Sequence, residues 1–384
     1  MKRMTLMLLL FLLSVTTVFG AEPKIAARGA ALIDGKTGRL LWGRNAEEPM
    51  AMASTTKIMT AIMVLENCRM DEVVTISKNA AHQPEVHMAL KEGERWKVGD
   101  LLSVMMLRSY NDAAVALAEH VSGGVAVFCQ KMTEKAKEIG AEDTVFGSPN
   151  GLDSHLSDAE HHSTAYDMAL IAAYALENET FREIISLPEI TVADVEGTHN
   201  CTVTNADRFL REYSGAVGVK TGYTNRAGHC FVGAAERGEV LLVSAVLGSG
   251  WGDSGKQKKW TDTKVLMDHG FSNFQNHEVL KRGDVFGEVK ITDSPIDTVE
   301  TVLAEEYTAL FSVEELDNLR LEADLPRERK APVEKGEKLG TAILFLGNEK
   351  IKEFDLLAKG GAPSFTLSER LHRLAENWMT WRKF

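Results

Sequence analysis

The sequence predicts an α/β protein of the α+β kind, with an antiparallel sheet flanked by helices and a small all-β domain after it. Apolar helical segments fill much of the first half of the chain, and β-rich runs separated by turns occupy residues 200–250. Short alternating strands with many glycines and charges follow at 276–360. A chain of 384 residues is long enough for one large and one small domain.

Residues 1–20 have the composition of a secretory signal peptide. Lys2 and Arg3 precede an uncharged run at 6–13, and Gly20 ends a small-residue site suited to cleavage before Ala21. The alternative is an uncleaved anchor, although the apolar run is short for a membrane span. Either alternative predicts export to the extracytoplasmic face of the cytoplasmic membrane, which is periplasmic if an outer membrane exists.

Residues 21–275 are expected to form the larger domain. Two apolar runs around a glycine-rich turn predict a hairpin over 30–42. The helix expected from Ser54 to Glu66 is apolar nearly all round, which predicts burial at the centre of the domain. Asp112 is expected to cap a helix. The other expected elements are helices at 101–107, 113–121, 127–139, 164–176 and 254–269, and an antiparallel meander of strands at 217–221, 229–234 and 240–247.

Residues 363–384 follow a Gly-Gly-Ala-Pro break and are expected to form an amphipathic helix. Tryptophan beside basic residues on such a helix suits the headgroup region of a membrane, so the segment is predicted to be an anchor. The alternative is a helix docked on its own protein. The residues on which the prediction depends are Leu371, Leu374, Trp378 and Trp381, with Arg370, Arg373, Arg382 and Lys383.

Charge and cysteine content narrow the possible partners. The formal net charge is −12, and it becomes more negative when the basic signal peptide is removed, which argues against a nucleic-acid partner. The spacing of the four cysteines matches no zinc pattern, and neither a metal site nor a cofactor is expected. Free thiols are favoured over disulfides, although an exported protein permits both. The cysteines are Cys68, Cys129, Cys201 and Cys230.

Three short motifs carry the predicted chemistry. In chain order they are Ser54-Thr55-Thr56-Lys57, Ser109-Tyr110-Asn111 and Lys220-Thr221-Gly222. Each motif alone is weak, because Ser54 alone suits a helix cap, Ser109 and Asn111 suit loop caps, and Lys220 suits a solvated strand. Together they supply what serine acyl transfer requires without a histidine.

The roles follow from the chemistry of each group. Ser54 is the expected nucleophile and Lys57 its base, with the Lys57 pKa lowered by burial and by the charge of Lys220. The Ser54 N–H at a helix N-terminus is an expected oxyanion donor. Ser109 is expected to relay a proton to the leaving amine, and Asn111 to hold Lys57 and a substrate amide. Lys220 and Thr221 are expected to bind a substrate carboxylate, and Gly222 lets the substrate lie against the strand.

These motifs resemble those of the serine-type D-alanyl-D-alanine carboxypeptidases, the low-molecular-mass penicillin-binding proteins. The resemblance covers essentially the whole mature chain, including Gly151-Leu152-Asp153, His161-His162-Ser163-Thr164, and Ala331-Pro332-Val333 in the small β domain. It implies a penicillin-binding/β-lactamase-like transpeptidase fold, removal of the terminal D-Ala from peptidoglycan stem peptides, and covalent inhibition by β-lactams. It also implies that the backbone N–H of Tyr223 is the second oxyanion donor, that the His161-His162 pair is structural, and that the C-terminal helix is an anchor.

One departure concerns the carboxylate of the substrate. Some relatives carry an arginine after the last strand of the sheet, whereas residues 247–251 contain none. Two alternatives stay open: Lys220 and Thr221 suffice for the carboxylate, or Arg226 or Arg208 contributes. Two rival functions remain open, an exported β-lactamase and a non-catalytic β-lactam sensor. A β-lactamase usually needs a glutamate that activates the deacylating water, and the loop 148–163 offers only Asp153, Asp158 and Glu160.

Overall fold

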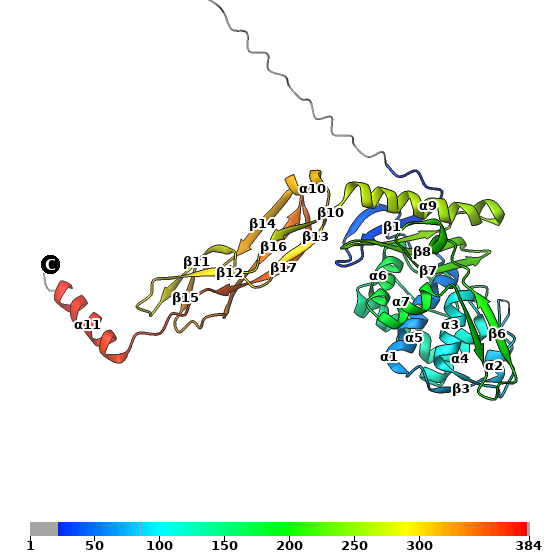
Figure 1. Ribbon diagram of the computed structural model, residues 1–384. Coiled ribbons are helices and arrows are strands. Elements are labelled where there is room, and N and C mark those ends of the chain that lie inside the picture. Colours follow the sequence, from blue (N-terminus) through cyan, green and yellow to red (C-terminus); the bar gives the residue numbers. More distant parts are fainter. Residues whose placement is uncertain (1–21, 85, 382–384) are drawn as a thin grey trace, which may run out of the picture.

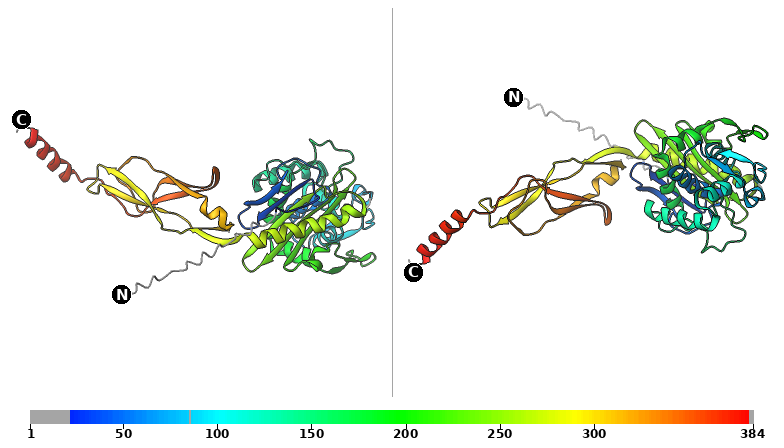
Figure 2. Two further views of the ribbon diagram at one scale, coloured as in Figure 1. Left: turned by 90° about the horizontal axis from the view of Figure 1, so that it is seen from above. Right: turned by 90° about the horizontal axis from the view of Figure 1, so that it is seen from below.

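A computed structural model describes residues 22–84 and 86–381, so the signal-peptide prediction lies outside the described residues. Within that range a large mixed domain, an elongated β domain and a terminal helix, α11 (Leu367–Trp381), follow one another end to end (Figures 1 and 2). The helix lies at the end of the molecule farthest from the large domain in all three ribbon views.

A five-stranded antiparallel sheet forms the centre of the large domain. Its order is β2 (Leu40–Arg44), β1 (Gly29–Asp34), β9 (Val240–Leu247), β8 (Gly228–Arg237) and β7 (Ala216–Thr224). The predicted hairpin and meander are therefore confirmed, and β9 joins the two by pairing with β1. Because β7 is an edge strand, one side of its backbone is left unpaired by the sheet.

Alternate residues of the strands face two different hydrophobic cores. On β1, Ile33 packs with the helices of one face, whereas Leu32 packs against α9 (Gly252–Asn273) on the other.

Smaller elements complete the domain. They are α2 (Lys78–Ala81), α8 (Phe209–Glu212), the paired strands β3 (Val73–Thr75) and β4 (Arg95–Lys97), and the paired strands β5 (Glu189–Ala193) and β6 (Asn200–Thr204).

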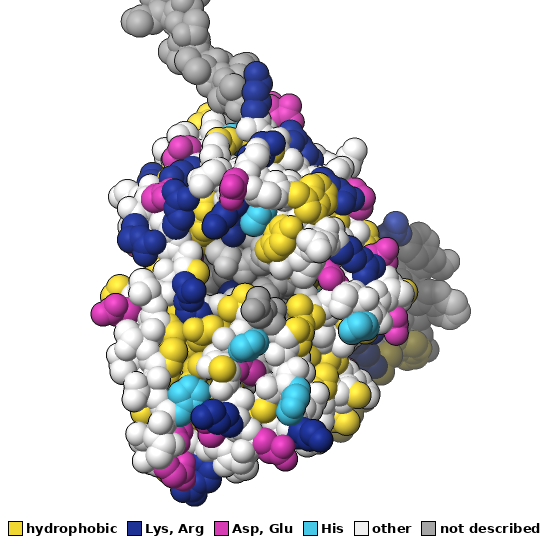
Figure 3. All heavy atoms as spheres, turned by 90° about the vertical axis from the view of Figure 1, so that its right-hand side faces the viewer, with side chains coloured by type: hydrophobic (Ala, Val, Ile, Leu, Met, Phe, Trp, Pro, Cys, Tyr) yellow, Lys and Arg dark blue, Asp and Glu magenta, His cyan; other side chains and the backbone are white. Residues whose placement is uncertain are grey.

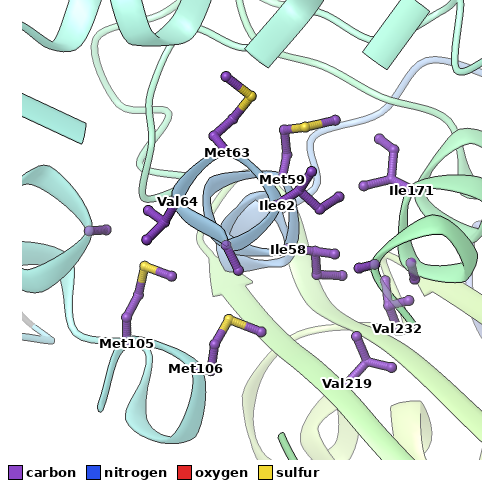
Figure 4. Packing of buried hydrophobic residues seen from close by; sticks show 14 of the residues in the cluster. Ile58, Met59, Ile62, Met63, Val64, Met105, Met106, Ile171, Val219 and Val232 are labelled. Atoms are coloured by element: carbon purple, nitrogen blue, oxygen red, sulfur yellow. The ribbon is translucent and has the colours of Figure 1, made fainter. Parts of the chain in front are cut away.

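Helix α1 (Lys57–Asn67) lies at the centre of the helical face, as its apolar sequence predicts. It continues a 3₁₀ turn, η1 (Ala53–Thr56), so the first turn differs from the expected α-helix. Figure 4 shows Ile58 and Ile62 surrounded by side chains from neighbouring elements. The helices that pack on α1 are α3 (Val98–Arg108), α4 (Asn111–Ser122), α5 (Val125–Ile139) and α6 (Ala165–Leu176), whereas α7 (Glu179–Ser186) packs on α3 and α6.

The prediction that Asp112 caps the following helix is wrong. The N-cap of α4 is Tyr110, and no side chain caps it. The buried Asp112 carboxylate instead accepts hydrogen bonds from the backbone N–H groups of Met88 (2.9 Å) and Leu90 (3.2 Å). These two buried N–H groups belong to a loop distant in sequence, and their hydrogen bonds orient the Asp112 carboxylate away from the capping position.

The small domain is all β. Six strands pair in the order β14 (Leu319–Asp324), β16 (Lys338–Leu346), β17 (Glu349–Ala358), β12 (Thr298–Leu303), β11 (Val285–Thr292) and β15 (Glu328–Lys330). Strands β10 (Gln275–Leu280) and β13 (Tyr307–Phe311) form a separate pair, and α10 (Val313–Asp317) follows β13.

The β1–β2 hairpin connects the two domains. The Asp34 carboxylate accepts a hydrogen bond from the backbone N–H of Leu310 at 3.2 Å. Arg39 forms an ion pair with Glu315 at 2.9 Å, donates to the Leu310 carbonyl, and lies 4.4 Å from the ring centroid of Phe311. The Arg39 side chain is only 8% exposed, so this joint is largely shielded from solvent.

Helix α11 exposes most of its described apolar side chains. Leu367, Leu371 and Leu374 are 75%, 59% and 65% exposed, and Trp378 is 57% exposed. Near the start of the helix, Arg370 forms an ion pair with Asp293 of the β domain at 2.6 Å. In the described part of the chain no single helix is long and apolar enough to cross a bilayer, although α4 and α5 together reach that length with a bend of 84°.

Candidate active site

Ser54 and Lys57 occupy consecutive turns at the start of the buried helix. Ser54 lies in η1, and Lys57, the first residue of α1, is fully buried. The Lys57 Nζ lies 3.1 Å from the Ser54 Oγ, which is the hydrogen-bond distance expected between a nucleophile and its base. Ala53, immediately before the serine, has a positive φ of 49°, a strained conformation for a residue with a side chain.

The other two contacts of the Lys57 Nζ are with groups that can only accept. It donates to the Asn111 Oδ1 at 2.9 Å and to the Asn150 carbonyl at 2.6 Å. A neutral amine has two N–H donors and one lone pair. With both donors used by these two acceptors, the lone pair of a neutral Lys57 is one acceptor for the Ser54 hydroxyl, and the Asn150 carbonyl, 3.3 Å from the Ser54 Oγ, is the other.

The electrostatic surroundings favour that neutral amine. Burial lowers the Lys57 pKa well below its ordinary value, and the positive charge of Lys220 lowers it further. The Asp112 carboxylate opposes them with a weaker effect. Both causes that the sequence predicted are present.

Ser109 and Asn111 lie at the junction of two helices, as predicted. Ser109 ends α3 in the left-handed conformation, with φ of 68°, which turns the chain sharply before α4 begins. Its Oγ is buried and has no hydrogen-bond partner among the described residues. Asn111 donates from Nδ2 to the Pro84 carbonyl at 3.1 Å. This bond fixes the orientation of the amide, so that Oδ1 accepts from Lys57.

The third motif lies on the edge strand β7, directly beside the nucleophile. A methyl group at Gly222 would come 3.0 Å from the Ser54 nitrogen and 3.1 Å from the Met52 carbonyl oxygen. Only a residue without a side chain lets the strand lie this close to η1. The strand thus brings the Tyr223 backbone to the same end of the cleft as the Ser54 N–H.

Lys220 is almost completely buried and contacts the Thr221 carbonyl at 3.1 Å. Burial and, to a smaller extent, the charge of Lys259 lower its pKa to about 7, against the opposing effect of Asp207. Thr221 is half-buried on the same strand. A cationic Lys220 therefore has a high electrostatic cost, which a bound carboxylate would reduce.

The loop after Phe146 adds two site residues that the sequence analysis did not single out for the site. The Asn150 carbonyl accepts from Lys57, and Gly151 packs on the nucleophile turn with φ of 82°. A Cβ on Gly151 would lie 2.0 Å from the Ala53 carbonyl oxygen. The Pro-Asn-Gly turn at 149–151 is visible in the sequence. The role of Asn150 is not, because it depends on a backbone carbonyl and not on the chemistry of a side chain.

The two arginines considered for the carboxylate have other partners. Arg226 donates to the Leu156 carbonyl at 2.7 Å and forms an ion pair with Asp158. Arg208 pairs with Glu212 at 2.6 Å. Lys220 and Thr221 stay the predicted carboxylate-binding groups.

His161 has a structural environment, as the resemblance implied. It is fully buried, and its Nδ1 accepts from the Gly147 N–H at 3.1 Å. Its Nε2 lies 3.3 Å from the Thr56 Oγ1, on the turn between Ser54 and α1. Burial lowers the His161 pKa to about 4, so the ring stays neutral and supports the turn.

The surface at this end of the large domain is divided by a hollow. Figure 3 shows several Lys and Arg side chains above the hollow, and more hydrophobic and His side chains below it.

All four cysteines are free in the structure, as the sequence favoured.

Comparison with known proteins agrees with this geometry. The profile described as D-alanyl-D-alanine carboxypeptidase matches residues 16–250, and the profile of the penicillin-binding protein 5 C-terminal domain matches residues 274–362. The chain is 31% identical over 358 residues to the D-alanyl-D-alanine carboxypeptidase DacF of Bacillus subtilis, covering 92% of this chain and 90% of the relative. It is 27% identical to DacD of Escherichia coli, covering 96% and 97%.

Solved structures lead to the same class. Penicillin binding protein 5 from Haemophilus influenzae superposes with a TM-score of 0.74 at 26% identity, covering 90% of this chain and 100% of that one. The fold and the three motifs thus define a protein of the penicillin-binding class. Within that class, the chain belongs to the D-alanyl-D-alanine carboxypeptidase family.

Proposed function

We propose that this chain is a serine-type D-Ala-D-Ala carboxypeptidase that removes the terminal D-Ala from peptidoglycan stem pentapeptides through an acyl-enzyme on Ser54. The observation that carries the proposal is the contact of 3.1 Å between Lys57 Nζ and Ser54 Oγ, with both remaining Lys57 contacts made to acceptors. That arrangement prepares a base for a hydroxyl that is a poor nucleophile by itself.

The reaction proceeds in two halves. The Ser54 Oγ attacks the carbonyl carbon of the penultimate D-Ala while its proton passes to the Lys57 Nζ, and the oxyanion accepts hydrogen bonds from the Ser54 and Tyr223 N–H groups. The C–N bond then breaks, and Ser109 donates its proton to the departing D-Ala amine and takes up the proton held by Lys57, which leaves Lys57 neutral again. Water hydrolyses the ester and restores Ser54. A β-lactam acylates the same oxygen because its ring amide takes the place of the scissile bond.

The substrate is held along the edge strand. An extended peptide can add to the unpaired side of β7, as peptides do at exposed sheet edges. The carboxylate of the last D-Ala binds Lys220 and Thr221, and the remaining N–H of the Asn111 amide reaches the substrate amide. No cofactor is needed for these steps.

The rival β-lactamase function lacks a free carboxylate in the loop 148–163. Asp153 accepts from the Thr224 hydroxyl at 2.7 Å, and Asp158 pairs with Arg226. Glu160 accepts from the Ser157 hydroxyl at 2.7 Å and its N–H at 2.8 Å. Each acid therefore has a structural partner, which favours a long-lived penicillin adduct over rapid deacylation.

Replacing Ser54 with alanine is expected to abolish D-Ala release from a peptide ending in D-Ala-D-Ala, because no other hydroxyl contacts Lys57 among the described residues. The released D-Ala is measured with D-amino acid oxidase, and the penicillin adduct by intact-protein mass. Ser186→Ala, at the exposed end of α7, is the matched control and should keep both.

Three results would contradict the proposal. Activity that survives in Ser54→Ala would show that the nucleophile is another residue. A wild-type adduct with fluorescent penicillin that disappears within milliseconds would indicate a β-lactamase. A wild-type protein that forms the adduct but releases no D-Ala would be a sensor.

We also propose that the mature protein works at the extracytoplasmic face of the cytoplasmic membrane, attached through residues 363–384. The exposed leucines of α11 support this, since soluble proteins rarely leave such a row uncovered. Deleting residues 363–384 is expected to abolish co-sedimentation with vesicles that contain anionic phospholipid.

Two pairs of substitutions in the tail test whether the hydrophobic side chains, and not the helix itself, are needed for vesicle binding. Leu371→Glu with Leu374→Glu should behave like the deletion, whereas Leu371→Ile with Leu374→Ile should still bind the vesicles. If the truncated protein sediments with vesicles as fully as the complete chain, the tail is not the anchor.

A further inference from the structure

A thiol, an imidazole and a carboxylate meet at the end of α1 opposite the nucleophile. Cys68 is the residue that ends α1, Glu72 lies in the turn before β3, and His120 is in the last turn of α4. Their ligand atoms all lie within 4.8 Å of one another. Sequence spacing does not reveal this cluster, because His120 follows Glu72 by 48 residues.

The three side chains already have much of the geometry of a metal site. The His120 Nε2 lies 3.3 Å from the Glu72 Oε2. A tetrahedral zinc ion with bonds of about 2.0–2.3 Å separates its ligand atoms by roughly 3.3–3.6 Å. The imidazole–carboxylate pair therefore has that separation now, and the Cys68 sulfur lies within 4.8 Å of both ligand atoms.

The turn that carries Glu72 is held by backbone contacts rather than by a metal. The Cys68 N–H bonds to the Val64 carbonyl at 2.9 Å, and the Val98 N–H bonds to the Glu72 carbonyl at 2.9 Å. The Glu72 Oε1 accepts from the Arg69 N–H at 2.9 Å, which keeps the carboxylate oriented and leaves Oε2 toward His120. The cluster is thus preorganised on three fixed segments.

The local charges are compatible with a cation. Glu72 supplies a carboxylate, which is a negatively charged ligand in its ordinary state at neutral pH. An opposing charge is the Arg69 guanidinium, which lies 3.8 Å from the Glu72 carboxylate. That side chain is 76% exposed and also pairs with Asp71, so it can turn to solvent at little cost.

We propose that Cys68, Glu72 and His120 bind a zinc ion, with water at the fourth position. Thiolate, imidazole and carboxylate are the three ligand types that zinc takes in proteins, and three protein ligands with an open position form a recognised site class. Binding replaces the S–H proton of Cys68, which passes to solvent. The ion would link the C-terminal end of α1 to the C-terminal end of α4.

The position has a consequence for the large domain. Helix α1 has eleven residues, so the cluster lies about 16 Å along the helix from Lys57. The zinc ion would not contact the catalytic groups. Its effect should be on the stability of the helical face, since a ligand that binds only the folded state stabilises it.

The test uses the tag-free mature chain, reduced with a phosphine and freed of metal by a chelator. Isothermal titration with ZnCl₂ is expected to show one site, and Zn²⁺ should raise the melting temperature. Cobalt chloride should produce a sulfur-to-cobalt charge-transfer band in the near ultraviolet. Cys68→Ser should abolish the band and weaken zinc binding by more than the 10- to 100-fold typical of losing an outer-shell partner.

Matched variants separate this site from adventitious binding. His120→Ala should weaken zinc binding as Cys68→Ser does. Cys201→Ser, a half-buried cysteine elsewhere, and His82→Ala, an exposed histidine, should bind like the wild type. Zinc binding that is absent, or that persists unchanged in the Cys68→Ser and His120→Ala variants, would overturn the proposal whatever the D-Ala release assay shows.

Discussion

Replacing Lys57 with methionine is expected to slow acylation by penicillin about 10²- to 10⁴-fold, the range that a positioned general base contributes. Methionine fills the buried volume with an unbranched chain but has no amine to take the Ser54 proton. The measurement is the rate at which fluorescent penicillin labels the protein. Labelling within tenfold of the wild-type rate would mean that another group deprotonates Ser54.

The substitution also removes a buried N–H donor. The Asn111 Oδ1 would lose its Lys57 partner, at a cost of about 1–3 kcal/mol, whereas the Asn150 carbonyl keeps the Ser54 hydroxyl at 3.3 Å. Circular dichroism and a melting curve must therefore accompany the kinetics. A folded variant that does not acylate would place the loss in the chemistry.

The pH profile distinguishes the two lysines. Lys57 must be neutral to act as base, so acylation of the wild type should rise with pH until its lowered pKa is passed. Lys220 must be cationic to bind a carboxylate, and its pKa of about 7 predicts that kcat/KM falls again as the pH rises beyond that value. The expected profile is bell-shaped, and Lys57→Met should lose the rising limb.

Gly151→Ala is the second substitution with a large expected effect. The new Cβ would lie 2.0 Å from the Ala53 carbonyl oxygen and 2.8 Å from the Ser54 nitrogen. Both are backbone atoms, so no side-chain rotation relieves the overlap, and the nucleophile turn must move. A displacement near 1 Å costs about 10²-fold in rate, which is the minimum loss expected in acylation.

Gly140→Ala supplies the matched control. Gly140 ends α5 with φ of 92°, and nothing lies within 4 Å of its added Cβ. It therefore reports the cost of a left-handed alanine alone, about 1–2 kcal/mol. Gly151→Ala should lose clearly more stability than this control and should lose activity as well. Equal stability and equal labelling rates would show that the loop does not constrain Ser54.

The sequence predicted those parts of the fold and site that side chains encode. The apolar surface of α1 indicated a buried helix, and burial of that helix led directly to the lowered pKa of Lys57. The runs that became β7, β8 and β9 were bounded by clear turns. These signals are local, so the sequence alone could carry them.

What the sequence could not provide depends on contacts between distant segments. Asp112 follows a helix junction and has the chemistry of a cap, but two N–H groups of the 86–90 loop bind its carboxylate instead. The role of Asn150 depends on a backbone carbonyl, which every residue possesses. The hairpin β5–β6 and helix α7 are short elements and were not expected.

The shielded joint between the domains bears on where the proposed anchor would hold the active site. Arg39 and Asp34 both bind the segment 310–315, so the β domain is a rigid spacer of constant length and not a flexible linker. If α11 rests on a lipid surface, the cleft is held at one working height above it. Stem peptides in the layer of wall at that height are then within range, and peptides closer to the lipid or farther out are trimmed by other means or not at all.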